Sequence, residues 1–387
     1  MQLSSKVQGA RNIRATFVTI IQVIKPPQWW VLLGALMLSS CASRAPSSGP
    51  PALSPAEAHT LIDRSLPPNV PDRSGWVNDL YAAFTALGIP PTRENACAVA
   101  AVIAQESGFR ADPVVPGLGA IAWREIDRRA AHAGIPSGIV HEVLKLDSPT
   151  GQSYGDRIDH ARTEKELSDI FEDFTGSLPL GRALFASWNP IRTRGPMQVN
   201  VAFADSFGAT HKYPYPIKVS LDEELFSRRG SLYFGTAHLL AYEAPYDRFL
   251  YRFADFNAGQ YSSRNAAFQG ALTRVSGMPL TADGALVPHD GSGKAGDTEL
   301  AARSIGRRLH LDENAIHAAL EEGRSPEFEQ SAVYRGVYRL AAQATGHPWP
   351  PAALPQIKLE GPKIERRLTT EWYAHRVDGR FEACLAR

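Results

Sequence analysis

The chain has 387 residues, 44% of them hydrophobic, which is enough to bury the core of one large domain or two smaller ones. Its 41 basic and 40 acidic residues give a net charge of +1, which becomes −3 without residues 1–40, because these carry four basic and no acidic side chains. Nucleic acid is therefore not an expected partner. The three cysteines and the scattered histidines lack the close spacing of metal ligands, so no metal site is expected.

Residues 1–40 have the pattern of a signal peptide. Four basic residues precede an apolar run of about ten residues over 29–38. This run is too short to span a bilayer, which takes roughly 20 apolar residues. The sequence Leu-Ser-Ser-Cys that ends at Cys41 resembles a bacterial lipobox, whose Cys becomes lipidated. The alternative is an ordinary secretory signal in which Cys41 has no special role.

A lipid anchor at Cys41 places the protein in the bacterial cell envelope. Residues 41–70 are then expected to form the lipidated, Pro/Ser-rich tether. Ala42, rather than Asp, follows the Cys, and this favours the outer membrane, with the protein facing the periplasm. The lipid anchor is the expected membrane contact, and no protein partner is indicated.

The rest of the chain is dominated by helical patterns. Convincing alternating strands are few, so the expected fold class is mainly α. Apolar residues three and four apart predict helices over residues 76–87, 92–107, 121–133, 164–174, 228–242, 298–309 and 327–342. Turn-forming residues predict loops over residues 113–119, 148–155, 212–216 and 277–296. A Pro-rich segment over 347–362 leads to what we expect to be a short C-terminal tail.

The helix over 92–107 ends with a candidate acid, Glu106. Glu106 follows Val102 and Ile103 at spacings of four and three, so it lies on the core-facing side. Gly108 is the usual residue just past a helix end. The negative end of the helix dipole and the loss of water both disfavour the ionised carboxylate. We therefore expect the pKa of Glu106 to rise toward the range in which a carboxylic acid delivers a proton near neutral pH.

Two further short runs follow Glu106 along the chain. Residues 195–199 read Gly-Pro-Met-Gln-Val, and residues 255–259 read Asp-Phe-Asn-Ala-Gly. Alone, the first could be a turn before a core segment, and the second an ordinary helix end. In this order with Glu106, they resemble the soluble lytic transglycosylase family. The lysozyme-like domain of that family carries a Glu-Ser pair, a Gly-Leu-Met-Gln turn and an Ala-Tyr-Asn-Ala-Gly segment.

The resemblance implies a goose-type lysozyme fold with additions. The lysozyme-like catalytic domain would cover residues 71–275, with a large helical insertion over 111–192. Residues 276–387 would supply a loop and a C-terminal helical region that packs on it. The sequence departs from the family in this insertion, because 92 residues separate Glu106 from Gln198, and it also carries Pro196, Asp255 and Phe256 at motif positions.

The resemblance also implies a role for each motif residue. Glu106 would be the catalytic acid and then the base, with the hydroxyl of Ser107 near the reacting sugar. Met197 and Gln198 would line the cleft, and Asn257 would contact the glycan, since an amide both donates to and accepts from an acetamido group. Trp123, Trp188, Phe256 and Tyr261 are the candidates for aromatic rings that stack on a sugar. In the family a later tyrosine also lies near the acid, and Tyr334 is the candidate for it.

The implied substrate is the glycan strand of peptidoglycan. A lytic transglycosylase cleaves the MurNAc–GlcNAc bond with one carboxylate, leaves a 1,6-anhydro-MurNAc end and needs no cofactor. A hydrolytic muramidase would need a second carboxylate, for which Asp112 and Asp255 are candidates, although caps of a turn and a helix are their simpler roles. A different class is a non-catalytic envelope lipoprotein that binds peptidoglycan or scaffolds other proteins.

Cys97 and Cys384 remain once Cys41 is assigned to the anchor. An oxidising compartment permits a disulfide between them. Two buried free thiols are the alternative, and the sequence favours neither the disulfide nor the thiols.

Overall fold

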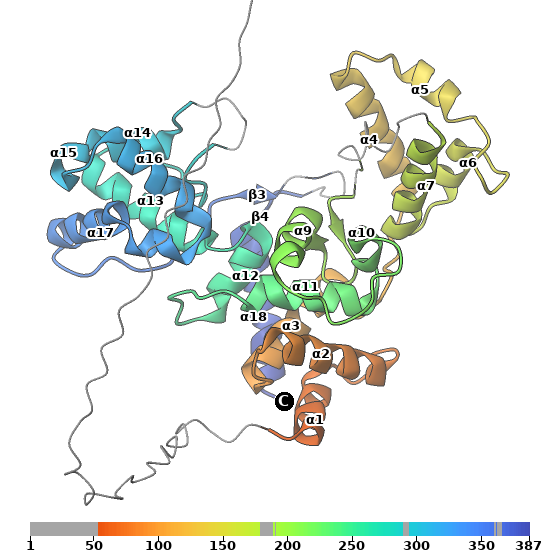
Figure 1. The fold of residues 1–387 in the computed structure, drawn as a ribbon, viewed down its shortest axis with the longest axis horizontal. Helices are drawn as coiled ribbons and strands as arrows, with labels where there is room; N and C mark the ends of the chain where they lie inside the picture. The colour runs from red at the N-terminus through yellow and green to blue at the C-terminus, as the bar shows by residue number, and fades with distance from the viewer. Residues whose placement is uncertain (1–52, 179–188, 190, 289–293, 360, 362–365) are drawn as a thin grey trace, which may run out of the picture. The chain divides into compact units, whose positions relative to one another are not determined.

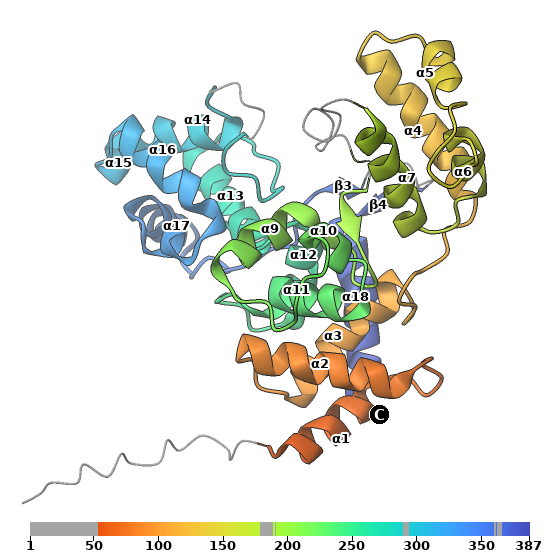
Figure 2. The same cartoon turned by 45° about the vertical axis from the view of Figure 1, so that its right-hand side comes forward.

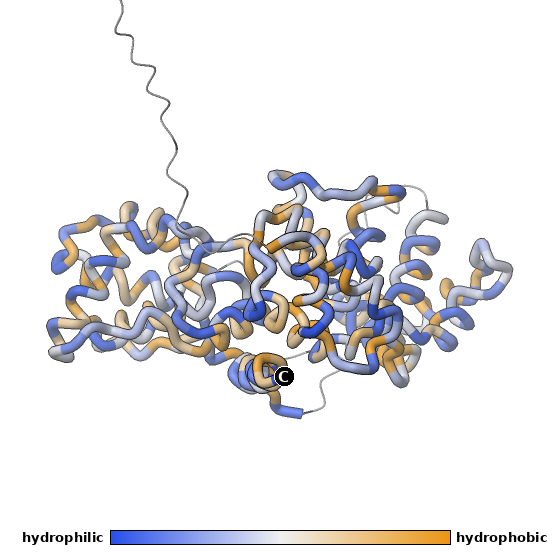
Figure 3. Tube along the Cα trace, turned by 90° about the horizontal axis from the view of Figure 1, so that it is seen from below, coloured by the Kyte–Doolittle hydropathy of each residue, from blue (hydrophilic) through white to orange (hydrophobic). Residues whose placement is uncertain are grey.

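The computed structural model describes residues 53–178, 189, 191–288, 294–359, 361 and 366–387. These residues form seventeen α-helices and four two-residue strands, so the predicted mainly α class is confirmed (Figure 1). The strands pair as two antiparallel hairpins, β1 (Thr193–Arg194) with β2 (Val199–Asn200) and β3 (Lys358–Leu359) with β4 (Leu368–Thr369). Figure 3 shows hydrophobic residues recurring between hydrophilic ones along the helices, the pattern of amphipathic packing.

The first hydrophobic core surrounds α3 (Arg93–Glu106). Every residue of α3 from Ala96 to Ile103 is buried, so this helix is covered on all sides. Thr92 begins it, because the Thr92 side chain accepts a hydrogen bond from the backbone N–H of Asn95. The other helices of this region are α1 (Pro55–Ser65), α2 (Arg73–Leu87), α9 (Val201–Thr210), α10 (Leu221–Glu224), α11 (Arg228–Leu240), α12 (Phe249–Ala258) and α18 (Thr370–Leu385).

Two further clusters of buried residues lie outside this core, and Figure 2 shows their helices as separate groups. The predicted insertion forms one of them, with α4 (Leu118–His132), α5 (Ser137–Val143), α6 (Tyr154–His160) and α7 (Glu164–Ser177). The other cluster joins α13 (Ser262–Ser276), which lies inside the predicted catalytic domain 71–275, to the C-terminal region, so it begins before the predicted boundary. Its further elements are α14 (Asp297–Ser304), α15 (Gly306–Leu309), α16 (Glu313–Glu321), the 3-10 turns η2 (Glu322–Arg324) and η3 (Pro326–Gln330), and α17 (Ala332–Thr345). The insertion therefore supplies most of a small core, to which Phe226 from the segment between α10 and α11 also belongs.

The predicted helices are present, and two of them are interrupted. The helix predicted over 298–309 is two helices, α14 and α15, with the break at Ile305. The helix predicted over 327–342 begins as the 3-10 turn η3, and α17 starts only after Ser331. Ser331 starts α17 because its hydroxyl accepts a hydrogen bond from the backbone N–H of Tyr334.

Two predictions, for the segments 41–70 and 363–387, differ from the structure. The tether expected over 41–70 includes α1, which begins at Pro55 with a capping box between Ser54 and Glu57. The expected C-terminal tail is α18, whose residues pack between α3 and α12. The return of α18 to the first core agrees with the expectation that the helical part of 276–387 packs on the preceding domain, and Ala52–Arg387 forms one compact unit.

Candidate active site

The candidate acid, Glu106, is the last residue of α3 and is half-buried. Tyr373, on α18, donates a hydrogen bond from its hydroxyl to Oε1 of Glu106, at 2.5 Å. The pKa of Tyr373 is raised well above its ordinary value. Burial is the largest cause, and the negative charge of Glu106 and its hydrogen bond act in the same direction. The phenol therefore stays protonated and donates, which fixes the orientation of the Glu106 carboxyl group.

The same helix joins Glu106 to the third motif. Thr370 lies one turn before Tyr373 on α18, and its Oγ1 donates a hydrogen bond of 2.8 Å to Oδ1 of Asn257. Asn257 is the exposed next-to-last residue of α12. One face of α18 therefore holds two polar side chains, Glu106 and Asn257, that lie far apart in the sequence.

The other end of α18 is fixed to α3 by a disulfide. Cys384 is bonded to Cys97, with the two Cα atoms 5.6 Å apart and 287 positions between them in the sequence. The disulfide, rather than two buried thiols, is thus the state that the structure contains. The hydrogen bond of Tyr373 to Glu106 therefore holds the start of α18 against the end of α3, and the disulfide holds the end of α18 against the start of α3.

The turn after Glu106 has unusual backbone geometry. Gly108 and Phe109 both have positive φ, 59° and 61°, and only the glycine adopts this conformation without strain. Phe109 is held there because its buried ring meets the ring of Trp76, with centroids 5.3 Å apart. The hydroxyl of Ser107 donates to the carbonyl of Ile103, at 3.2 Å, and so helps to end the helix.

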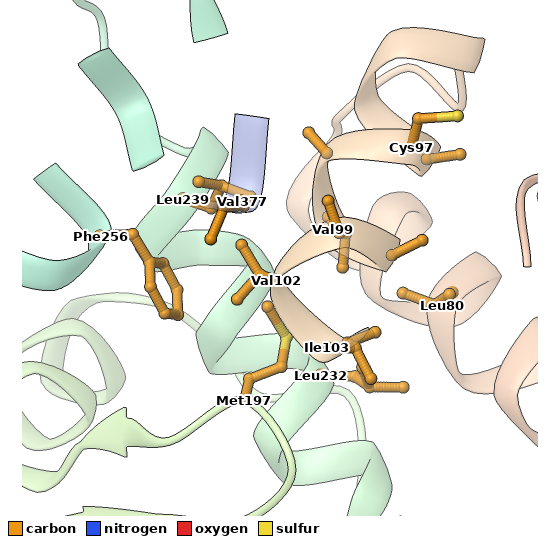
Figure 4. Packing of buried hydrophobic residues seen from close by; sticks show 14 of the residues in the cluster. Leu80, Cys97, Val99, Val102, Ile103, Met197, Leu232, Leu239, Phe256 and Val377 are labelled. Carbon is orange, nitrogen blue, oxygen red and sulfur yellow. The ribbon is translucent and has the colours of Figure 1, made fainter. Parts of the chain in front are cut away.

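The second motif forms the turn between β1 and β2. Met197 is fully buried, and Figure 4 shows its side chain pointing at α3, near Val102 and Ile103. Its predicted place in the cleft lining is wrong, because this apolar side chain belongs to the core. Gly195 has a φ of 70°, and a Cβ there would lie 2.2 Å from the carbonyl oxygen of Leu225, so the turn requires glycine.

Gln198 connects this turn to the insertion. Its Oε1 accepts a hydrogen bond from Thr193, and its Nε2 donates to Oε2 of Glu164, both at 2.8 Å. Glu164 is the first residue of α7. Both ends of the Gln198 amide are therefore engaged within the protein, and its place in the cleft lining stays a prediction.

Asp255, in the third motif, is a fully buried residue of α12 whose carboxylate lies at the start of α13. Its carboxylate accepts four hydrogen bonds, from the hydroxyls of Tyr242 and Tyr246 and from the backbone N–H groups of Tyr261 and Ser263. Burial raises the pKa of Asp255 to about 6, although these donors oppose the shift. Asp255 is thus a helix cap, which is the simpler of the two roles considered for it.

The third motif also faces the cavity in this part of the molecule. A cavity of about 560 Å³ is lined by Phe256, Asn257 and Gly259, by α9, and by the loop and η2 of the C-terminal region. Phe256 also contacts the ring of His238, with centroids 5.1 Å apart. The C-terminal region therefore supplies part of the wall beside Asn257.

Several other predicted site residues lie elsewhere. Tyr334 is packed against Phe268 and Phe328 in the C-terminal cluster, so the tyrosine at the acid is Tyr373 instead. Tyr261 is buried beneath the guanidinium of Arg264, at 4.2 Å.

Trp123 donates a hydrogen bond from Nε1 to Asp159 within the insertion, at 2.7 Å. Trp188 and Cys41 lie outside the described residues, as does the predicted signal peptide over 1–40. Asp112 is an exposed residue just after the turn that follows Glu106. The pKa of its carboxyl group is raised above the ordinary value, chiefly because the carboxyl group itself is partly removed from water.

Across the described ranges, no group of three or more His, Cys, Asp or Glu side chains could hold a metal ion. In the same ranges, none of the helices combines the length and the apolar character needed to cross a membrane.

The chain belongs to the family described as "Protein of unknown function (DUF1615)", whose family model matches residues 69–387. It is 48% identical over 354 residues to "Uncharacterized protein YaiW" of Escherichia coli (strain K12), and the matched region covers 92% of this chain and 96% of that relative. No solved structure matches the chain. Neither description names an activity, a substrate or a ligand.

Proposed function

We propose that this protein is a peptidoglycan lytic transglycosylase with a lysozyme-like catalytic domain around α3. It would cleave the MurNAc–GlcNAc bond and leave a 1,6-anhydro-MurNAc end, with Glu106 as its single catalytic carboxylate. One observation carries the proposal: a half-buried glutamate at the end of a buried helix, held at 2.5 Å by the buried hydroxyl of Tyr373. The order of the three motifs supports it.

Glu106 acts twice in the proposed reaction. It first protonates the glycosidic oxygen as the acetamido oxygen of the MurNAc unit attacks its own anomeric carbon, so the bond to the leaving sugar breaks. The resulting carboxylate then takes the proton of the C6 hydroxyl of the same MurNAc unit. The C6 oxygen attacks the anomeric carbon, the acetamido oxygen leaves, and Glu106 is protonated again. Tyr373 is a positioning residue, because it acts through the carboxyl group of Glu106.

A muramidase would need a second carboxylate beside the bond. The buried Asp255 is unsuited to this role, because four donors already occupy its oxygens. Asp112 is the remaining candidate from the sequence, and a reducing end in the product would point to it.

We place the protein in the cell envelope, anchored by lipid at Cys41 and facing the periplasm from the outer membrane. The lipobox-like sequence supports this, and the disulfide Cys97–Cys384 agrees with an oxidising compartment.

The decisive experiment is analysis of the soluble products that the purified full chain releases from sacculi. Anhydro-muropeptides are the expected product. Reducing ends would instead identify a muramidase. Retained binding without release would identify the non-catalytic class, an envelope protein that binds peptidoglycan.

A further inference from the structure

The cavity beside Asn257 contains an unusual histidine. His238 is only 8% exposed and lies between the rings of Phe203 and Phe256, at centroid distances of 4.4 and 5.1 Å. Its ring lines the cavity, and among the described residues its nitrogen atoms have no hydrogen-bond partner. Burial lowers the pKa of His238 to about 4, so the ring is neutral at physiological pH. A neutral imidazole offers one donor and one acceptor to a ligand.

Other groups with hydrogen-bonding capacity face the same cavity. Oδ1 of Asn257 accepts from Thr370, and Nε2 of Gln260 donates to the carbonyl of His238. In the described part of the chain, the Asn257 Nδ2 and the Gln260 Oε1 have no partner. The cavity therefore presents a donor, an acceptor and an imidazole that serves as either.

The charged groups of this cavity are engaged or lie on exposed residues. Oδ1 of Asp283 accepts hydrogen bonds from Gln269 and from the backbone N–H of Ala285. Glu321 and Arg324 are exposed. An uncharged polar ligand thus matches the interior better than an anion or a cation does.

We propose that this cavity binds an uncharged N-acetylhexosamine unit of the glycan strand, and that the C-terminal region provides the wall that makes the subsite. The inference rests on the proposed function, because the same α12 carries Asn257, which α18 links to Glu106. The acetamido carbonyl accepts from the Asn257 Nδ2 or from the imidazole, and the acetamido N–H donates to the Gln260 Oε1. Phe203 and Phe256, which both line the cavity, make this part of its wall apolar.

The C-terminal wall includes Gly284–Leu286 and the turn η2, which are held in place by buried hydrogen bonds. The amide Nδ2 of Asn265 donates to the carbonyls of Gly284 and Gly323, at 3.2 and 2.8 Å. The wall is therefore attached to α13 and is positioned before a ligand arrives.

The test measures binding of a linear tetramer of β-1,4-linked N-acetylglucosamine to the full chain carrying Glu106→Gln, so that no cleavage interferes. Two added substitutions place a large side chain at exposed positions that line the cavity, Ala285→Trp in the C-terminal region and Ser206→Trp on α9. Ala318→Trp, at an exposed position of α16 outside the lining, is the matched control. His238→Phe keeps an aromatic ring between Phe203 and Phe256 but removes the nitrogen atoms.

We expect each Trp variant to weaken binding about tenfold or more, because its side chain takes up space that the sugar needs. We expect His238→Phe to weaken binding about tenfold, the effect of losing one hydrogen bond, with the Ala318→Trp chain unchanged. If His238→Phe does not fold, the two Trp variants still decide the question. Unchanged binding in both Trp variants would overturn the inference, and so would no binding by the Glu106→Gln chain itself. Product release from sacculi by the unsubstituted chain is measured separately. Absence of release tests the proposed function, and unchanged binding by the Trp variants tests this subsite, so the two failures can be told apart.

Discussion

Tyr373 donates a hydrogen bond of 2.5 Å to Glu106, although 267 positions of sequence separate the two residues. The contact exists because α18 packs on α3 and the disulfide Cys97–Cys384 holds the far end of the pair. The last helix of the chain is therefore part of the candidate active site. Any change that releases α18 should alter the chemistry of Glu106 as well as the stability of the fold.

Glu106→Gln should abolish release of anhydro-muropeptides and leave the fold intact. The amide is nearly the same size as the carboxylic acid, but it cannot give and then take a proton. General acid–base groups typically contribute about 10²–10⁴-fold, so we expect a fall of at least about a hundredfold in turnover of sacculi. Glu382→Gln, at an exposed position of α18, is the control for the charge change. Undiminished release by the Glu106→Gln chain would remove Glu106 from the role.

Tyr373→Phe should lower turnover while keeping the fold, because the ring still fills its buried position. A hydrogen bond to an ionisable group contributes about 1.5–3 kcal/mol, so the loss should be about 10- to 100-fold. Tyr334→Phe is the matched control, because that ring packs in the C-terminal cluster. Equal effects of the two substitutions on turnover would contradict the assignment of Tyr373. The pH profile of turnover should also change for Tyr373→Phe and not for Tyr334→Phe.

The helix α3 and its end at Glu106 were predictable from local sequence. Thr92 is a strong N-cap, the following residues are small and apolar, and Gly108 stops the helix. The contact of Glu106 with Tyr373 was not predictable in this way, because local sequence patterns carry no information about a residue 267 positions away. The family resemblance suggests a later tyrosine near the acid, but the sequence around the candidate, Tyr334, matches the family pattern poorly, and the tyrosine at the acid is Tyr373.

A signal for α18 was nonetheless present. Tyr373, Val377, Phe381 and Cys384 recur at spacings of four, four and three, and all four are buried. Charged and polar residues between them, together with the preceding Pro-rich segment, gave the appearance of a tail.

Met197 shows a different limit of prediction from sequence. A motif indicates which residues meet in a turn, but only packing decides whether a side chain faces the core or a cavity.

The disulfide should be detectable in the chain carrying Cys41→Ala, which leaves only Cys97 and Cys384. Denatured without a reductant, that chain should show no free thiol, and two free thiols would exclude the bond. The chain-entropy model gives roughly 5 kcal/mol for a loop of this length, and loss of a native disulfide typically costs about 2–5 kcal/mol. We expect reduction to lower the free energy of unfolding by an amount in this range and to lower turnover with it, because α18 carries Tyr373.

His238 should make the protein lose stability as the pH falls. The pKa of His238 is lowered to about 4 in the folded protein from about 6.5 in the unfolded chain, so the unfolded chain binds the extra proton first. The contribution is fully present above pH 6.5 and is lost as the pH falls toward 4, by about 3 kcal/mol in total.

Asp255 acts in the opposite direction over nearly the same range, because its folded pKa is raised to about 6 from 3.8. Between pH 6 and 4 the folded protein holds that proton more tightly, so this group adds stability as the pH falls. The two contributions partly cancel in the unsubstituted chain, and only a comparison with a variant separates them.

The comparison is the difference in free energy of unfolding between the unsubstituted chain and His238→Asn, measured with urea from pH 7 to pH 4. Asp255 and the other carboxylates contribute to both chains and drop out of the difference. We expect the advantage of the unsubstituted chain to shrink by about 3 kcal/mol as the pH falls across this range. Ser206→Asn, at an exposed position on the same cavity, should show a difference that does not vary with pH. A constant difference for His238→Asn would mean that the ring is not buried in its neutral form between Phe203 and Phe256.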